Sequence, residues 1–292
     1  MTHMEIRPTT PEDLERLDFS YRHRYADGWR PNGSSFVAVI DGRIVGIVHS
    51  CPNRIHPTRD LLLGYVVPEY RRRGIATALV TEVRTRAATM LSVKAYPGTD
   101  DHRFVTSLGA TPYQTCPPMT VDTSRADVIE WAQRHHGEVV CGTKFTTDDV
   151  AEFLLTEYEV THASWSPTAP REDLDDWLVP ELMNDLDLSR SYFVSDDGRI
   201  VAGCVVYGEP PLNIYGDNRG GTIEMCGPAP FPEHPRSRVG LAACMAEALL
   251  EADGSLVGFD GHVTDRHFYP LLLTIPGVTG RTLELLEIPY RG

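Results

Sequence analysis

The sequence lacks the features that would indicate a membrane, secreted or metal-binding protein. Its longest dense apolar run, Leu61 to Val67, is interrupted by Gly64 and is far too short to cross a bilayer. No basic segment followed by a long apolar one opens the sequence, which predicts no secretion signal. Six cysteines without a C-x-x-C pair, and histidines without H-x-x-x-H on a plausible helix, predict no metal site. The cysteines are expected to be reduced and buried in a cytoplasmic protein.

Basic residues are fewer than acidic ones, 27 against 41, and the charges are unevenly distributed along the chain. The whole chain carries a net charge of −14, which argues against nucleic acid as a partner. Residues 1–124 hold 15 basic and 13 acidic side chains, whereas the remaining residues hold 12 and 28. The first part therefore suits a polyanionic ligand and the second attracts cations, although an acidic surface also simply keeps a protein in solution. A length of 292 residues with 41% apolar side chains allows two globular domains.

The most informative stretch joins an apolar strand to an amphipathic helix through a tight basic turn. Leu61 to Val67 leads into three consecutive arginines and Gly74. The helix that follows places apolar side chains on one face, at Ile75, Leu79, Val83 and Ala87. The first four N–H groups of such a helix are unpaired and point at one place, so the turn is a ready-made anion site that Gly74 opens to close approach.

These residues resemble the pyrophosphate-binding motif of the GNAT acyltransferase superfamily, V-x-P-x-x-R-x-x-G-[IL]-[GA]-x-x-L, at every required position. The resemblance implies acetyl-CoA as co-substrate, with its pyrophosphate on the backbone amides of the turn and its thioester near the preceding strand. The expected binding residues are Val66, Val67, Arg71, Arg72, Arg73, Gly74, Ile75, Ala76 and Thr77. It also implies direct attack by an amine, with no covalent enzyme intermediate.

A diverged internal repeat predicts two copies of this plan. The hairpin pattern of residues 36–46, with Asp41-Gly42 as its turn, returns at residues 192–202, and the tripeptide at Gly74 returns at Gly240. We therefore expect two tandem GNAT folds of α/β class, each a mixed, mostly antiparallel twisted sheet flanked by helices. The expected domains are residues 1–122 and 146–292, joined by a linker with a helix over 123–145. Capping boxes at Ser124 and Thr146 predict helix starts.

The motifs expected of an active copy are divided between the two. The tyrosine that the family uses as general acid is replaced by Val105 in the first copy, so Tyr96 is the substitute there. The second copy restores the tyrosine as Tyr269, with Glu224 as a candidate base, but has Ser237 where Arg71 stands. Three arrangements stay open: a first copy that uses Tyr96, a second copy that uses Tyr269 and Glu224, or a thiolate protonated through water. Asp60, Tyr65 and His49 are further candidate bases.

The function expected is N-acetylation of a small cationic amine, an antibiotic or a metabolite, by a monomer or homodimer that binds neither nucleic acid nor membrane. The acidic segment from Glu172 to Asn184 is expected to form a helix that attracts such an amine, unless it is only a solvated face. Protein or peptide acetylation, and a non-catalytic sensor that binds acyl-CoA, are the alternatives.

Overall fold

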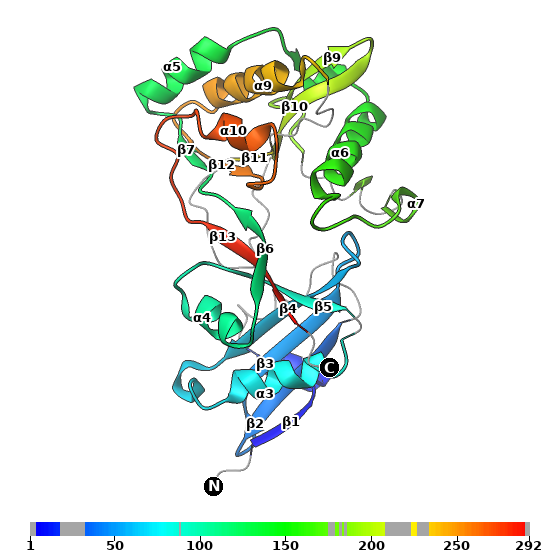
Figure 1. Cartoon of the computed structure of the whole chain (residues 1–292), viewed down its shortest axis with the longest axis vertical. Helices are drawn as coiled ribbons and strands as arrows, with labels where there is room; N and C mark the ends of the chain where they lie inside the picture. Colours follow the sequence, from blue (N-terminus) through cyan, green and yellow to red (C-terminus); the bar gives the residue numbers. More distant parts are fainter. Residues whose placement is uncertain are drawn as a thin grey trace. The chain divides into compact units, whose positions relative to one another are not determined.

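The computed structural model describes residues 4–17, 33–87, 89–174, 179–180, 183, 186–207, 223–226 and 234–289, the segment 223–226 by its backbone alone. The chain divides into two compact units, which are residues 1–113 with 284–292 (unit 1) and residues 114–283 (unit 2). Each unit holds a mixed sheet with helices against it (Figure 1). The expected α/β class, with mostly antiparallel sheets flanked by helices, is confirmed.

Unit 1 is built on a sheet with the strand order β1-β2-β3-β4-β5-β13-β6. Neighbours from β1 to β4 pair antiparallel, β4 and β5 pair parallel, and β5 and β13 pair antiparallel. Its strands are β1 (Met4–Pro8), β2 (Ser34–Ile40), β3 (Arg43–Pro52), β4 (Arg59–Val66), β5 (Met90–Ala95), β6 (Thr111–Cys116) and β13 (Leu283–Ile288). Its helices are α1 (Pro11–Arg16), the 3-10 turn η1 (Pro68–Tyr70), α3 (Ile75–Arg84) and α4 (Asp100–Ser107).

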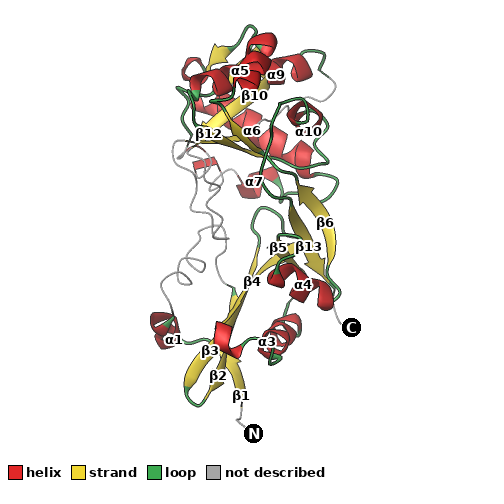
Figure 2. Cartoon of the chain, turned by 90° about the vertical axis from the view of Figure 1, so that its left-hand side faces the viewer, coloured by secondary structure: helices red, strands yellow, loops and turns green. Residues whose placement is uncertain are grey.

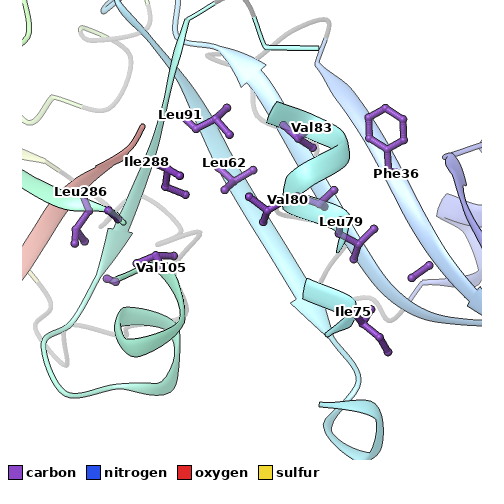
Figure 3. Packing of buried hydrophobic residues seen from close by; sticks show 14 of the residues in the cluster. Phe36, Leu62, Ile75, Leu79, Val80, Val83, Leu91, Val105, Leu286 and Ile288 are labelled. Carbon is purple, nitrogen blue, oxygen red and sulfur yellow. The ribbon is translucent and has the colours of Figure 1, made fainter. Parts of the chain in front are cut away.

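Helices cover both faces of this sheet. The apolar side of α3 packs on β2, β3 and β4 in a buried cluster that includes Leu62, Leu79 and Val83, and Figure 3 shows these side chains between the helix and the strands. Gly46 on β3 allows this contact, since a Cβ there would lie 3.0 Å from Ile75 Cγ2. Leu14 of α1 packs on the opposite face, and Figure 2 shows α1 and α3 on the two sides of the sheet.

Unit 2 repeats the plan with the strand order β7-β12-β11-β10-β9-β8. Helix α9 lies along β9 and β10 with most of its side chains buried (Figure 1). The strands are β7 (Thr120–Asp122), β8 (Val140–Cys141), β9 (Tyr192–Asp196), β10 (Arg199–Tyr207), β11 (Ile223–Cys226) and β12 (Leu256–Asp260). The helices are α5 (Ala126–His135), η2 (Gly142–Lys144), α6 (Thr147–His162), α7 (Arg171–Leu174), α9 (Ser237–Glu251) and α10 (Phe268–Leu272).

The two sequence halves exchange their last strands: β7, the last strand of the first half, lies in the sheet of unit 2, and β13, the last strand of the second half, lies in the sheet of unit 1. Strand β13, from the end of the chain, pairs with β5 of unit 1, from Glu284 opposite Ala95 to Ile288 opposite Leu91. Strand β7, which follows β6 along the chain, pairs with β12 of unit 2. The compact units consequently divide near residues 113 and 283, whereas the sequence repeat placed the first boundary at residue 122.

Local signals account for the turns and for several helix starts. Both predicted Asp-Gly hairpins are present, with positive φ at Asp41 and Gly42 and again at Asp197 and Gly198. The predicted capping box at Thr146 is formed with Asp149, and α6 begins at the next residue.

The capping box predicted at Ser124 is wrong, because Arg125 is the N-cap residue of α5 and no side chain caps that helix. The Ser124 hydroxyl instead bonds back to Asp122. The predicted acidic helix is described only in part, as α7 and residues 179–180 and 183. Its other residues lie outside the described residues.

Candidate functional site

The turn between β4 and α3 leaves the start of the helix open. Gly74 is the N-cap residue of α3, with a left-handed φ of 79°, and no side chain caps the helix. The first hydrogen bond of the helix runs from the Ala78 N–H to the Gly74 carbonyl, at 3.0 Å. The N–H groups from Gly74 to Thr77 therefore point outward without a helical partner. A Cβ on Gly74 would meet no atom within 4 Å, so there is room for a ligand beside the backbone.

The three arginines of the turn are exposed and differ in their partners. Arg71 donates from Nε to the Val66 carbonyl at 2.9 Å. Arg73 donates from a terminal nitrogen to the Glu69 carbonyl at 3.0 Å and lies over the ring of Tyr70. Arg72 has a positive φ of 63°. Three guanidinium groups next to four outward N–H groups form a site suited to a polyanion.

Strands β4 and β5 separate next to this turn. Their parallel pairing covers three residue pairs, from Arg59–Met90 to Leu61–Ser92, in the part of the chain that the structure describes. Both strands nevertheless continue, β4 to Val66 and β5 to Ala95. Beyond the last pair, β5 is held on its other side by β13 and β4 by β3. The sheet thus has an opening between its two central strands, at the end nearest the phosphate turn.

Backbone direction along β4 decides which groups face this opening. The Val67 N–H donates to the Val45 carbonyl of β3 at 3.0 Å, so the peptide groups of odd-numbered residues on β4 point to β3. Those of Gly64 and Val66 must point the other way, towards β5, because alternate residues of a strand bond to opposite sides. We call Gly64 and Val66 the open edge of β4. Val67 was expected to offer its N–H as well, but that group belongs to the β3–β4 ladder.

The C-terminal strand is tied into unit 1 by side chains as well as by its ladder. Arg59 of β4 donates to Glu287 of β13 at 3.0 and 3.1 Å and stacks on Tyr113, with 3.9 Å between the guanidinium carbon and the ring centre. His102 of α4 lies 2.9 Å from Glu284 of β13. The sequence reasoning missed these partners. The alternating pattern of residues 283–288 indicates a strand but carries no signal of which sheet it joins.

The candidate acids occupy different units. Tyr96 follows β5 directly in unit 1, and its carbonyl accepts two hydrogen bonds from Thr99, the N-cap residue of α4. Val105 is 4% exposed in the core of unit 1, so the position where the family carries its tyrosine faces the interior (Figure 3). Tyr269 lies on α10 of unit 2, half-buried.

The candidate bases are spread over both sheets. Asp60, at the start of β4, accepts a hydrogen bond from the Thr89 hydroxyl at 2.7 Å. Tyr65 is 37% exposed, with the Arg71 guanidinium 5.8 Å from its ring centre. His49 is buried on β3, opposite Leu63 of β4. Glu224 lies on β11 of unit 2 between Tyr207 and Gly258, and its side chain is outside the described residues.

The corresponding helix of unit 2 begins differently. Helix α9 starts at Ser237, which is completely buried and donates its hydroxyl to the Val201 carbonyl at 3.2 Å. Gly240 lies inside the helix, where a Cβ would be 3.1 Å from the Cβ of Ala202. Strands β11 and β12 pair along all four described residues of β11, to Cys226 opposite Asp260. No side chain caps α9 either, but it differs from α3 in its buried first residue and in having its glycine inside the helix, against the sheet.

Residues 2–109 match the model of the acetyltransferase (GNAT) family. The match covers 108 of the 292 residues and includes the turn around Gly74. Enzymes of this family take acetyl-CoA as co-substrate. Among curated protein sequences, no relative of the chain is found.

Solved structures extend the likeness over the whole chain at the level of the fold. A GCN5-related N-acetyltransferase from Sphaerobacter thermophilus is 14% identical, with a TM-score of 0.59 over 98% of this chain and 96% of that one. A tandem GNAT protein from the clavulanic acid biosynthesis pathway is also 14% identical, with a TM-score of 0.59 over 99% and 100%. A GCN5-related N-acetyltransferase from Anabaena variabilis is 13% identical, with a TM-score of 0.56 over 98% and 72%. The chain therefore has a tandem GNAT fold, as its repeat predicts.

None of the helices in the described ranges combines the length and the apolar character that crossing a bilayer demands.

Proposed function

We propose that this GNAT protein binds acetyl-CoA on unit 1. The observation that carries the proposal is the separation of β4 from β5 beside the uncapped start of α3. The pyrophosphate would accept hydrogen bonds from the amides of residues 72–77, with the arginines of the turn around it. The pantetheine arm would lie along the open edge of β4, where the Val66 N–H is the donor for the thioester oxygen.

The reaction that this arrangement supports is direct attack of a neutral amine on the thioester carbon. The C–N bond forms, the C–S bond breaks, and the thiolate takes up a proton while the amine loses one. The chain contributes by binding both reactants in place and by donating to the oxygen on which negative charge develops. Tyr96 is our candidate for the proton donor, because it follows β5 at the end where that strand has left β4.

Unit 2 has fewer of the groups that a CoA site requires. The first residue of its helix α9 is the buried Ser237, whose hydroxyl donates to the Val201 carbonyl, and the guanidinium of Arg236 is bonded to Ser195 and Asp196 of β9. We therefore favour unit 1 for the co-substrate. Tyr269 and Glu224 remain the acid and base of the alternative in which unit 2 is catalytic.

For the acceptor we propose a small cationic amine, such as an antibiotic or a metabolite, in a cytoplasmic enzyme that acts as a monomer or homodimer. The support is the net charge of −16 after residue 124, against +2 before it. Helix α7 lies in the described part of the acidic segment, and its Arg171 is bound by Glu152 and Glu159 of α6. Protein or peptide acetylation is the second enzymatic candidate, and the buried Val105 favours a non-catalytic sensor as the third.

The co-substrate site is tested with two matched glycine variants. Gly74 and Gly42 both have positive φ, 79° and 74°, and open space where a Cβ would stand. Gly74→Val and Gly42→Val should therefore cost similar backbone strain. Isothermal titration with acetyl-CoA should give a Kd raised at least about tenfold, about 1.4 kcal/mol, for Gly74→Val alone. Equal affinities for the two variants would contradict a phosphate site at Gly74.

The acceptor is tested by turnover of acetyl-CoA against a panel of amines and peptides. For a cationic acceptor, kcat/KM should fall as salt rises, since attraction between exposed charges is screened beyond about 8 Å at physiological ionic strength. A salt-independent kcat/KM, or a neutral acceptor, would show that the acidic charge serves solubility. Binding of acetyl-CoA without turnover on any acceptor would favour the sensor.

A further inference from the structure

The side chain of Arg71 connects the phosphate turn to the strand that would carry the thioester. Its Nε donates to the carbonyl of Val66, the last residue of β4, at 2.9 Å. Four residues of the turn lie between the two in sequence, and the bond closes that turn on itself. Because Nε makes this bond, the two terminal nitrogens of the guanidinium lie beyond it, on the side of the group away from the Arg71 backbone.

The Val66 carbonyl that receives this bond lies on the open edge of β4. Val67 bonds to Val45 on β3, so both the N–H and the carbonyl of Val66 point towards the side from which β5 has departed. Without Arg71, that carbonyl would present a partial negative charge next to the place where the thioester oxygen becomes negative. With Arg71 in place, the Val66 carbonyl accepts a hydrogen bond from a positively charged group. The N–H of Val66 is then the group of this residue that is left to bond a ligand in the opening.

We propose that Arg71 is a positioning residue that prepares the Val66 amide to polarise the thioester, in addition to any contact with phosphate. The inference rests on the proposed function, since it takes the thioester to lie against Val66. In this proposal the side chain of Arg71 affects both the binding of the pyrophosphate and the polarisation of the thioester of acetyl-CoA. A guanidinium drawn towards the pyrophosphate by its terminal nitrogens keeps its Nε on the strand end.

Two substitutions of Arg71 distinguish its hydrogen bond to the Val66 carbonyl from the effect of its positive charge. In Arg71→Gln the amide nitrogen stands the same number of bonds from Cα as the arginine Nε, so the donor to the Val66 carbonyl is kept and the charge is lost. Arg71→Met has similar length and neither donor nor charge. Both variants should bind acetyl-CoA more weakly to a similar extent. Infrared difference spectra of bound acetyl-CoA labelled with ¹³C at its thioester carbonyl should show a lower carbonyl frequency for wild type and Arg71→Gln than for Arg71→Met.

The rate of acetyl-CoA hydrolysis at saturating acetyl-CoA, followed by thiol release, should be about tenfold lower in Arg71→Met than in Arg71→Gln. Arg73→Gln and Arg73→Met are the matched controls, because Arg73 reaches the Glu69 carbonyl through a terminal nitrogen that neither replacement reproduces. These two should resemble each other in frequency and rate. The thermal midpoint of each variant establishes that it folds.

Equal carbonyl frequencies and equal rates in Arg71→Gln and Arg71→Met would overturn the positioning role and leave Arg71 as a charge alone. That result is distinct from failure of the proposed function. If acetyl-CoA affinity is the same in wild type, Gly74→Val and both Arg71 variants, the co-substrate does not lie on this turn at all.

Discussion

Helices α3 of unit 1 and α9 of unit 2 each follow the central strands of their sheet, and each contains Gly, a branched apolar residue and Ala in succession. In α3 that glycine is the N-cap, with a left-handed φ of 79° and no atom near a would-be Cβ. In α9 the glycine is in the second turn, pressed against the Cβ of Ala202 at 3.1 Å. The same pattern of glycine, branched apolar residue and alanine accompanies an accessible backbone in one unit and close packing in the other.

The contact between helix and sheet explains the exchange of roles. In unit 1 the small residue is Gly46 on the strand, which admits the larger Ile75 on the helix. In unit 2 the strand carries Ala202 at the corresponding position, and the helix supplies the glycine. Close packing requires one small partner at each crossing, and either element can provide it. A glycine that fills this role in α9 is not available for binding phosphate.

The largest effect is expected from the strand that unit 1 receives from the end of the chain. Leu286 is 1% exposed and belongs to the core beneath α3, so Leu286→Ala should destabilise unit 1 by about 3 kcal/mol through lost burial and a cavity. Hydrogen exchange should rise in β4, β5 and α3. Leu249→Ala, in α9, is the control and should affect unit 2 instead. Faster exchange in unit 2 upon Leu286→Ala would contradict the division into units.

The next effect separates the two units as catalysts. If unit 1 carries the chemistry, Tyr96→Phe should lower kcat by roughly 10²-fold, the contribution of a general acid, whereas Tyr269→Phe should change it little. The measurement is steady-state turnover with the best acceptor from the panel. The reverse pattern would move the reaction to unit 2, and equal, small effects would favour protonation of the thiolate through water.

Each unit also holds a carboxyl group at low exposure, with opposite consequences. In unit 1 the Arg7 guanidinium donates to Asp13 at 2.5 and 2.9 Å and holds the pKa of that carboxyl well below its usual range. In unit 2 burial raises the pKa of Glu157 on α6 to about 8, helped by the charges of Asp265 and Asp260, although the Thr161 hydroxyl donates to it at 2.7 Å.

The two carboxyl groups predict opposite pH dependences. Asp13 binds fewer protons folded than unfolded, so its stabilisation is present above about pH 4 and is lost as pH falls through the folded pKa. Glu157 binds more protons folded, so stability falls as pH rises from about 4.5 to about 8. At pH 8, Glu157→Gln should stabilise unit 2 by about 2 kcal/mol, and Asp13→Asn should destabilise unit 1 by about 2 kcal/mol. Thermal melts from about pH 2 to about pH 8 cover both titrations. A Glu157→Gln effect that is independent of pH would exclude a titrating carboxyl at this position.

The smallest effect tests the two glycines directly. Gly240→Ala brings a methyl group within 3.1 Å of Ala202 and 3.2 Å of Val194, which should destabilise unit 2 by about 1 kcal/mol as the helix shifts outward. Acetyl-CoA affinity should stay unchanged. The thermal midpoint measures the loss of stability, and isothermal titration with acetyl-CoA measures the affinity for the co-substrate. A weaker Kd for Gly240→Ala would indicate that unit 2 also binds acetyl-CoA.

Short-range features could be predicted from the sequence because neighbouring residues create them. Asp-Gly pairs adopt the positive φ that both hairpins need, and Thr146 caps α6 through Asp149 three residues later. The apolar spacing from Ile75 to Val83 predicts the face of α3 that is buried. The motif around Gly74 predicts the GNAT family, which the family model confirms for residues 2–109.

Only the tertiary structure decided which strands meet. Residues 283–288 alternate as any half-buried strand does, and nothing within them selects β5 over β12 as a neighbour. The opening between β4 and β5 exists because β13 and β3 take up the outer sides of those strands, and Val105 is buried because α4 packs against the same core. Such pairings depend on shape and burial between segments that lie far apart in sequence, whereas periodicity reports only the face that a segment hides.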